Sequence, residues 1–277
     1  MHPLLRFGFS LYGMKGVEVD RALRACAEIG YDCVEFVAMP GWPTDPQSVS
    51  TAERRRLRDL LVTLKLTLPA IMENLLVQAE EEKHRANLER LREAADLGHA
   101  LSPKAHPVIE TVLGGKPGQW TAIRDRVAER LMSWAEVGRE MKTVIAVKPH
   151  VSNALRTPED ARWLARQVNS PWLKLAFDFS HFQLQGYKLA DAIVPMAGQT
   201  RFVHIKDAEG DAKKVKFLLP GEGNTDYAEY FRLLKANGYR DAIVVEVSGQ
   251  VFNQPGYDPM AAARKCFEKV APAFAKI

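Results

Sequence analysis

Cysteine, an excess of one charge and long apolar stretches are all scarce in this chain of 277 residues, and each shortage excludes a class of protein. The three cysteines, Cys26, Cys33 and Cys266, form no CxxC pair, which argues against a disulfide framework or a cysteine-based zinc site. Lysine and arginine number 38 against 34 aspartates and glutamates, and the basic runs 53–58 and 213–216 are short and far apart. A nucleic-acid surface is therefore not expected.

No segment approaches the roughly eighteen uninterrupted apolar residues that mark a membrane span. The first residues also lack a basic region followed by a long apolar run. We therefore expect a cytoplasmic protein with reduced cysteines and no membrane partner. Hydrophobic residues make up 47% of the chain, which is enough to bury one large core.

Eight short apolar runs rich in β-branched and aromatic residues alternate with eight longer segments of helical period. The expected strands are 6–12, 33–39, 66–72, 107–113, 143–148, 173–178, 201–206 and 242–247. The expected helices are 17–30, 51–65, 81–98, 120–141, 158–168, 189–198, 226–238 and 258–277. This alternation predicts an α/β fold, and at this length a single-domain (β/α)8 TIM barrel over residues 1–277 is more economical than an open sheet. The longest irregular pieces, 39–51 and 207–225, are expected to be loops that follow strands, where a barrel keeps its chemistry.

Polar residues occur at matching heights near the ends of four of the later strands. Because side chains alternate along a strand, one polar residue of each strand should face the barrel axis. These residues are Lys148, Asp178, His204 and Glu246. Ionisable groups there must be paired or bound to a metal, since an isolated buried charge is costly. Asp178, His204 and Glu246 form a ligand set that suits Mn²⁺, Mg²⁺, Co²⁺ or Zn²⁺. The alternative is a buried network of ion pairs that closes the barrel.

Five motifs resemble those of the xylose isomerase-like TIM-barrel family, which contains sugar phosphate isomerases and epimerases and also endonuclease IV. They are GYDCVEF (30–36), FDFSHF (177–182), FVHIKD (202–207), PGEGNTDY (220–227) and GYRDAIVVEVS (238–248). The resemblance spans the whole chain. It implies a divalent metal held by a glutamate after strand five, an aspartate after strand six, a histidine after strand seven and a glutamate after strand eight. Asp178, His204 and Glu246 match the last three of these positions.

Lys148 departs from this pattern. Where relatives usually have a glutamate, one residue and a histidine, this chain has Lys148-Pro149-His150, and a protonated lysine cannot bind a metal. A metal could still bind, more weakly, or the ammonium could replace part of its charge by pairing with Asp178 and Glu246. A symmetric mechanism with two glutamates is therefore in doubt. Glu246 is the candidate base, and Lys148 is a candidate acid or electrostatic clamp, unless it is only a structural counter-ion.

The resemblance implies a small carbohydrate as substrate, and several side chains near the strand ends are candidates for binding it. They are His150, His181, Lys206, Glu35 and Trp42. The histidines could hydrogen-bond a sugar hydroxyl, the lysine could hold an anionic group, and the tryptophan could cover the apolar face of a sugar. The second-strand glutamate would add acid to the pocket, as would Glu110 of the fourth strand, although a structural role is the commoner outcome for both.

The preferred hypothesis is a carbohydrate isomerase or epimerase that uses a divalent metal and removes a proton next to a carbonyl. Two alternatives stay open: a related lyase that acts on keto-glycosides, and a sugar-binding or regulatory barrel whose metal site has degenerated. A nuclease like endonuclease IV would need three zinc ions, and the seven histidines are too scattered to supply their ligands. Barrels of this kind often pair through surface helices, so a homodimer is a further expectation.

Overall fold

The computed structural model describes residues 5–77 and 80–277, and within them eight parallel strands close into a barrel. The strands are β1 (Arg6–Ser10), β2 (Cys33–Val37), β3 (Thr67–Met72), β4 (Val108–Thr111), β5 (Ile145–Val147), β6 (Leu173–Asp178), β7 (Thr200–Ile205) and β10 (Ala242–Val245). Strands that follow one another in the chain lie side by side, and β1 closes the ring against β10 with Phe9 opposite Val245. The predicted (β/α)8 fold is confirmed.

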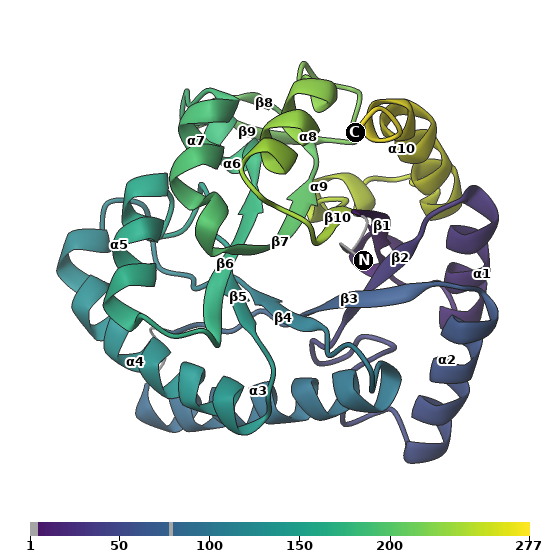
Figure 1. Cartoon of the computed structure of the whole chain (residues 1–277), viewed down its shortest axis with the longest axis horizontal. Helices are drawn as coiled ribbons and strands as arrows, with labels where there is room; N and C mark the ends of the chain where they lie inside the picture. The colour runs from purple at the N-terminus through teal and green to yellow at the C-terminus, as the bar shows by residue number, and fades with distance from the viewer. Residues whose placement is uncertain (1–4, 78–79) are drawn as a thin grey trace.

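Helices between the strands form a ring around the barrel (Figure 1). The longer ones are α1 (Val19–Ile29), α2 (Thr51–Thr63), α3 (Glu81–Leu101), α4 (Trp120–Glu140), α5 (Pro158–Val168), α7 (Leu189–Met196), α8 (Tyr227–Ala236) and α10 (Pro259–Phe274). The described ranges also contain four short helical turns that the sequence period did not reveal. Three follow a strand: η1 (Leu11–Met14), α6 (Phe179–Gln183) and α9 (Gly249–Phe252). The fourth, η2 (Ala197–Gln199), precedes β7. Across the described ranges, each helix is either too short or too polar to cross a membrane.

The interior of the barrel is lined by a separate set of small and medium side chains. They are Cys33, Ala70, Ala146, Ala176, Phe202, Ala242 and Val244. Ala146, Ala176 and Val244 each lie two residues before a polar residue of the predicted ring, so the alternation expected from the sequence holds. Close contact between β1 and β2 also depends on Gly8, because a Cβ added there would lie 2.4 Å from the sulfur of Cys33.

The segment 207–225, expected to be an irregular loop, contains an antiparallel hairpin. It consists of β8 (Asp207–Gly210) and β9 (Val215–Leu218), with Ala208 opposite Phe217. The hairpin packs on the barrel through a small hydrophobic cluster of Val151, Leu184, Ala208 and Phe217, separate from the main core. The hairpin was not predicted because its strands have four residues each, too few for a hydrophobic period to stand out in the sequence. Its position after β7 brings Phe217 to the end of the barrel where the strands finish.

Candidate active site

The four residues of the predicted ring lie together at the carboxyl end of the barrel. Asp178 ends β6 and is in register with His204 of β7, while Lys148 and Glu246 follow the last residues of β5 and β10. All four are buried, with Glu246 the most exposed at 8%. The parity of side chains along each strand therefore suffices to bring these groups to one place.

Lys148 is held by partners from three other strands. Its Nζ lies 3.1 Å from Glu110 Oε1, 3.0 Å from Glu246 Oε2 and 2.9 Å from Nδ1 of His204. Burial alone would lower the pKa of Lys148, but Glu110 and Glu246 raise it above its ordinary value. Lys148 therefore stays an ammonium ion and balances carboxylates from β4 and β10.

A second ammonium group lies beside the first. Lys206 Nζ bonds Asp178 and lies 2.8 Å from Glu246 Oε2, and it also faces the ring of Phe217 at 5.1 Å from the centroid. Only 3% of Lys206 is exposed, so this residue is part of the buried cluster and is not a solvated loop lysine. The ammonium lies between two of the three side chains predicted to bind a metal, Asp178 and Glu246.

Glu246 is the junction of the cluster. Its Oε2 accepts from Lys148 and Lys206 and lies 3.2 Å from Nδ1 of His204. Burial would raise the pKa of this carboxyl, but Lys148, Lys206 and His204 together hold it well below its usual value. Glu246 is therefore ionised in the resting protein, and one of its oxygens accepts hydrogen bonds from two ammonium groups.

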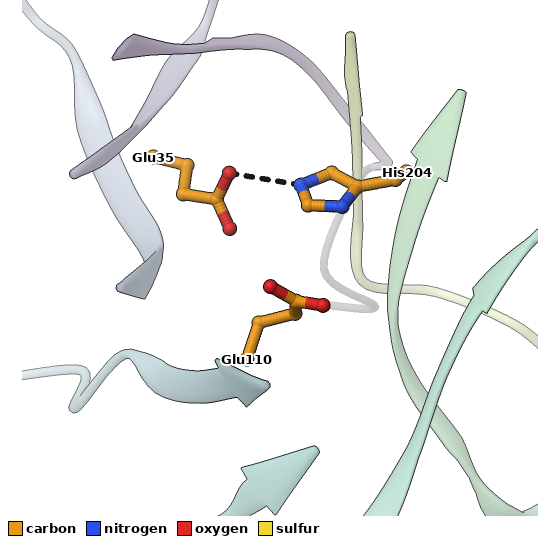
Figure 2. Close-up of side chains that lie close together, drawn as sticks. All are labelled: Glu35, Glu110 and His204. Atoms are coloured by element: carbon orange, nitrogen blue, oxygen red, sulfur yellow. Dashed lines mark hydrogen bonds and ion pairs between the residues drawn. The ribbon is translucent and has the colours of Figure 1, made fainter. Parts of the chain in front are cut away.

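Three buried side chains near Lys148 can converge on one cation. Glu35, Glu110 and His204 each offer a ligand atom within 4.8 Å of the others (Figure 2). His204 Nε2 lies 2.8 Å from Glu35 Oε2, whereas the second oxygen of Glu35 and Oε2 of Glu110 have no hydrogen-bond partner, and Glu110 Oε1 has only its ion pair with Lys148. Buried carboxylate oxygens without donors are costly, and two carboxylates with one imidazole suit a divalent ion. These residues fit a metal.

The charge of the cluster supports this fit. Four carboxylates face two ammonium groups, so with a neutral His204 the cluster carries excess negative charge. Burial raises the pKa of Glu110, and the charges of Glu35 and Glu246 raise it further. Lys148 and His204 lower this pKa, but only in part. Burial lowers the pKa of His204, but Glu35 and Glu246 together outweigh burial and raise the value to about 9. Without a metal His204 therefore tends to hold an extra proton, which a bound ion would replace.

The metal set predicted from the sequence, Asp178, His204 and Glu246, stays a prediction. Its members share one cluster, but within the described ranges the donors that converge are Glu35, Glu110 and His204. Sequence reasoning expected mainly a structural role for Glu110, although the rule that identified the ring applies to it equally. Val108 and Glu110 lie two positions apart on one strand, as do Cys33 and Glu35, so both glutamates face the axis.

The two predicted sugar-binding histidines contact each other. The rings of His150 and His181 lie 3.9 Å apart, and Phe217 packs edge-on against His181. Burial, with smaller contributions from Lys206 and Lys148, lowers the pKa of His150 to about 4, and burial also lowers that of His181. Both imidazoles are therefore neutral near pH 7, and a neutral imidazole can donate one hydrogen bond and accept another.

Trp42 lies at the edge of the site with an aromatic partner that the sequence did not suggest. Its ring stacks on Tyr12 at 5.1 Å, and Tyr12 in turn meets the edge of Phe252 at 5.0 Å. Burial and the charge of Glu246 raise the pKa of Tyr12, so the hydroxyl of Tyr12 interacts electrostatically with the cluster. Tyr12 follows the end of β1 by two residues, and that position was the available signal. The role of Trp42 as a sugar wall stays a prediction.

A family match and overall similarity define the class of protein. The family described as the xylose isomerase-like TIM barrel matches residues 23–270, so the chain belongs to this family, as the sequence motifs predicted. A fructoselysine 3-epimerase from Escherichia coli O157:H7 is 20% identical, over 91% of this chain and 93% of the relative. An inosose dehydratase from Clostridium tetani (strain Massachusetts / E88) is 22% identical, over 68% of this chain and 69% of its own. The chain thus resembles sugar epimerases and a dehydratase.

One solved structure with the same fold contains a metal. The IOLI protein with a bound zinc atom superposes with a TM-score of 0.80 at 17% identity, over 98% of this chain and 100% of that one. At this identity the likeness shows the fold alone. Together with the convergent Glu35, Glu110 and His204, it is compatible with a divalent metal in this barrel without indicating which one.

Proposed function

We propose that this protein is a carbohydrate isomerase or epimerase that moves a proton at a carbon next to a carbonyl. The observation that carries the proposal is the meeting of two ammonium groups on one oxygen of Glu246 at the carboxyl end of the barrel. TIM-barrel chemistry takes place at this end. A carboxylate flanked by ammonium groups provides a base and positive charge for an enediolate in one place.

Glu246 and Lys148 have complementary roles in this reaction. Glu246 is ionised and can accept the proton, while Lys148 stays protonated and can stabilise the developing oxyanion or return a proton. Proton transfer to Glu246 removes its charge and so leaves Lys148 and Lys206 free to face the new negative charge of the substrate. Glu110, whose Oε1 lies 3.1 Å from Lys148 Nζ, keeps that ammonium in place.

A divalent ion, Mn²⁺, Mg²⁺, Co²⁺ or Zn²⁺, would be held by Glu35, Glu110 and His204. When bound, such an ion polarises a carbonyl and an adjacent hydroxyl and so acidifies the neighbouring C–H. The set expected from the sequence would use Asp178 and Glu246 with His204, and it requires Lys206 to leave its place between the two carboxylates. Because Lys148 and Lys206 already neutralise part of the cluster, we expect weak metal binding.

The substrate we propose is a small carbohydrate that enters from the hairpin side. Neutral His150 and His181 are placed to exchange hydrogen bonds with hydroxyl groups, and Trp42 with Tyr12 offers an aromatic face for C–H groups. The expected location is the cytoplasm, where the buried thiols of the cysteines stay reduced. Gel filtration with light scattering would test the expected homodimer.

The decisive experiment follows deuterium uptake by NMR in D₂O with a panel of keto-sugars, aldo-sugars, sugar acids and 3-keto-glycosides. We expect exchange at one carbon of at least one compound, with and without added Mn²⁺. Glu246→Gln should abolish the exchange, because the amide cannot accept the proton. Glu209→Gln is the matched control, since Glu209 is an exposed glutamate paired with Lys216 on the hairpin, and it should exchange at the normal rate.

The two alternative functions predict different results in the same NMR experiment. A sugar-binding or regulatory barrel would show saturation transfer to a sugar with no deuterium uptake, and the mutual pairing of the lysines with carboxylates is the feature that favours it. A lyase, as the similarity to a dehydratase suggests, would release water or a leaving group and accumulate a new unsaturated product. Exchange that persists in Glu246→Gln would remove Glu246 from the mechanism.

A further inference from the structure

A second cavity lies at the other end of the barrel, away from the candidate active site. Its volume is about 740 Å³, and its lining includes the first residues of four strands, Arg6, Thr67, Val108 and Ala242. Parallel strands of a barrel all begin at the same end, so this cavity opens at the amino end, opposite the chemistry. Its size falls within the range of small-molecule sites, roughly 300–1,000 Å³.

The floor of the cavity is apolar and its rim is basic. Leu61, Leu66 and Leu68 are buried residues of the floor. The rim carries five cationic side chains, which are Arg6, Arg58, Lys104, Arg201 and Arg240, whereas the described lining has one carboxylate, Asp241. A concave site with charge of one sign concentrates ligands of the opposite sign.

Few carboxylates face the charges of this rim. Arg201 donates to the carbonyl of Thr200, and Arg240 donates to two carbonyls. Burial raises the pKa of the nearby Asp241 carboxyl, and the charge of Arg201 partly opposes this rise. Of the five rim cations, Arg58 has a carboxylate within ion-pair distance among the described residues, the neighbouring Asp59 at 3.1 Å. By contrast, Arg54 and Arg56 of the same helix each pair with an aspartate of another element.

We propose that this cavity binds a small amphipathic anion, with a carboxylate or phosphate head at the arginine rim and an apolar body on the leucine floor. Guanidinium groups suit both heads, because they donate paired hydrogen bonds to planar or tetrahedral oxyanions. The leucines lose contact with water when the apolar body enters. Binding at this site does not depend on the reaction at the carboxyl end, so an experiment can support or refute it independently of the proposed function.

The test is calorimetry of the whole chain with three ligands of equal tail length: decanoate, decyl phosphate and decyltrimethylammonium. We expect the anions to bind at least about tenfold more tightly than the cation, and binding to weaken when salt is raised, because screening acts on exposed charges. The relative affinity of decanoate and decyl phosphate shows which head the rim prefers. Sugar exchange at the other end should be unaffected.

Charge reversal locates the site. Arg201→Glu and Arg240→Glu should each weaken binding of decyl phosphate by about tenfold, whereas Arg264→Glu, an exposed arginine on α10 outside the cavity, should leave it unchanged. Arg201→Gln, which removes the charge without reversing it, should have a smaller effect in the same direction. Equal affinity for the cation and the anions, or anion binding that ignores both charge reversals while the variants fold normally, would overturn the proposal.

Discussion

Two ionic clusters in this molecule use the same kinds of side chain in opposite surroundings. On the surface, Arg56 pairs with Asp20 at 2.5 Å and with Glu53 at 2.7 Å, and 46% of the arginine side chain is exposed. In the barrel, Lys148 pairs with Glu110 and Glu246 at similar distances, and only 3% of the lysine is exposed. Distances alone therefore do not distinguish an exposed ion pair with little effect on stability from a buried ion pair that controls the chemistry of a site.

The difference lies in what replaces a lost partner. Water and salt take the place of a missing partner at the surface, whereas a buried charge keeps its full desolvation cost. The surface cluster should therefore tolerate change, while the buried cluster should transmit any change to stability, metal affinity and proton transfer together. The following substitutions test that contrast, from the largest expected effect to the smallest.

Lys148→Met should lower the free energy of unfolding by about 3–5 kcal/mol and abolish proton exchange, because Glu110 and Glu246 lose their shared counter-ion. Urea unfolding measures the first effect and NMR in D₂O the second. Lys174→Met is the matched control. Lys174 is partly exposed and bonds Gln199, so this substitution should lower the free energy of unfolding by about 1 kcal/mol or less. Adding Glu110→Gln to Lys148→Met should restore part of the stability; a loss that it leaves unchanged would mean the pair is not coupled.

Glu35→Gln and Glu110→Gln should each weaken Mn²⁺ binding by at least about tenfold, or about 1.4 kcal/mol, because each removes a charged ligand atom from the convergent group. Calorimetry on protein stripped with a chelator measures this. The control is again Glu209→Gln, with unchanged affinity. If Asp178→Asn weakens the metal and Glu110→Gln does not, the ligand set predicted from the sequence is the correct one, and Lys206 must move on binding.

Phe217→Ala should make the buried cluster behave more like the surface one, because Phe217 covers Lys206 and His181. We expect the free energy of local opening at the hairpin to fall by about 1–2 kcal/mol, seen as faster amide exchange in β8 and β9, with a smaller change in global stability. Leu218→Ala is the control, since Leu218 lies outside the small hydrophobic cluster. Slower or unchanged exchange would show that the hairpin does not depend on this contact.

Arg56→Met should cost less than about 1 kcal/mol, and the cost should shrink further at high salt. Hydrogen bonds from Arg56 lower the pKa of Asp20 and Glu53 in the folded protein. Lowered carboxyl pKa values stabilise the fold above their unfolded values, near pH 4, and this contribution is lost as the pH falls through the folded values. Urea unfolding at pH 7 and pH 3 should show the wild type and Arg56→Met converging at pH 3; a constant gap would contradict the linkage.

Much of the fold and part of the site were predictable because they rest on local patterns. The alternation of short apolar runs with helical segments depends on neighbouring residues, and it predicted the eight strands within about three residues. The two-residue repeat within β5, β6, β7 and β10 predicted which polar side chains face the axis. The family motifs added the expectation of sugar chemistry, which agrees with the relatives.

Partner choice inside the barrel was not predictable in the same way. Lys148 meets Glu110, 38 positions earlier in the chain, and Lys206 meets Asp178 of the preceding strand, so each contact depends on how deep a flexible side chain reaches. The hairpin strands have four residues each, too few to show a clear apolar period, so the position of Phe217 was also missed.

By itself, the sequence determined a closed barrel with acids, a histidine and a lysine facing its axis. It could do so because the alternation of apolar and polar residues is a local property of each strand. Only the tertiary structure decided that two ammonium groups enter the carboxylate cluster, that Glu35 and Glu110 converge with His204, and that a basic cavity opens at the other end. These features arise between strands distant in the chain, where side-chain length, burial and closure of the ring set which charges meet.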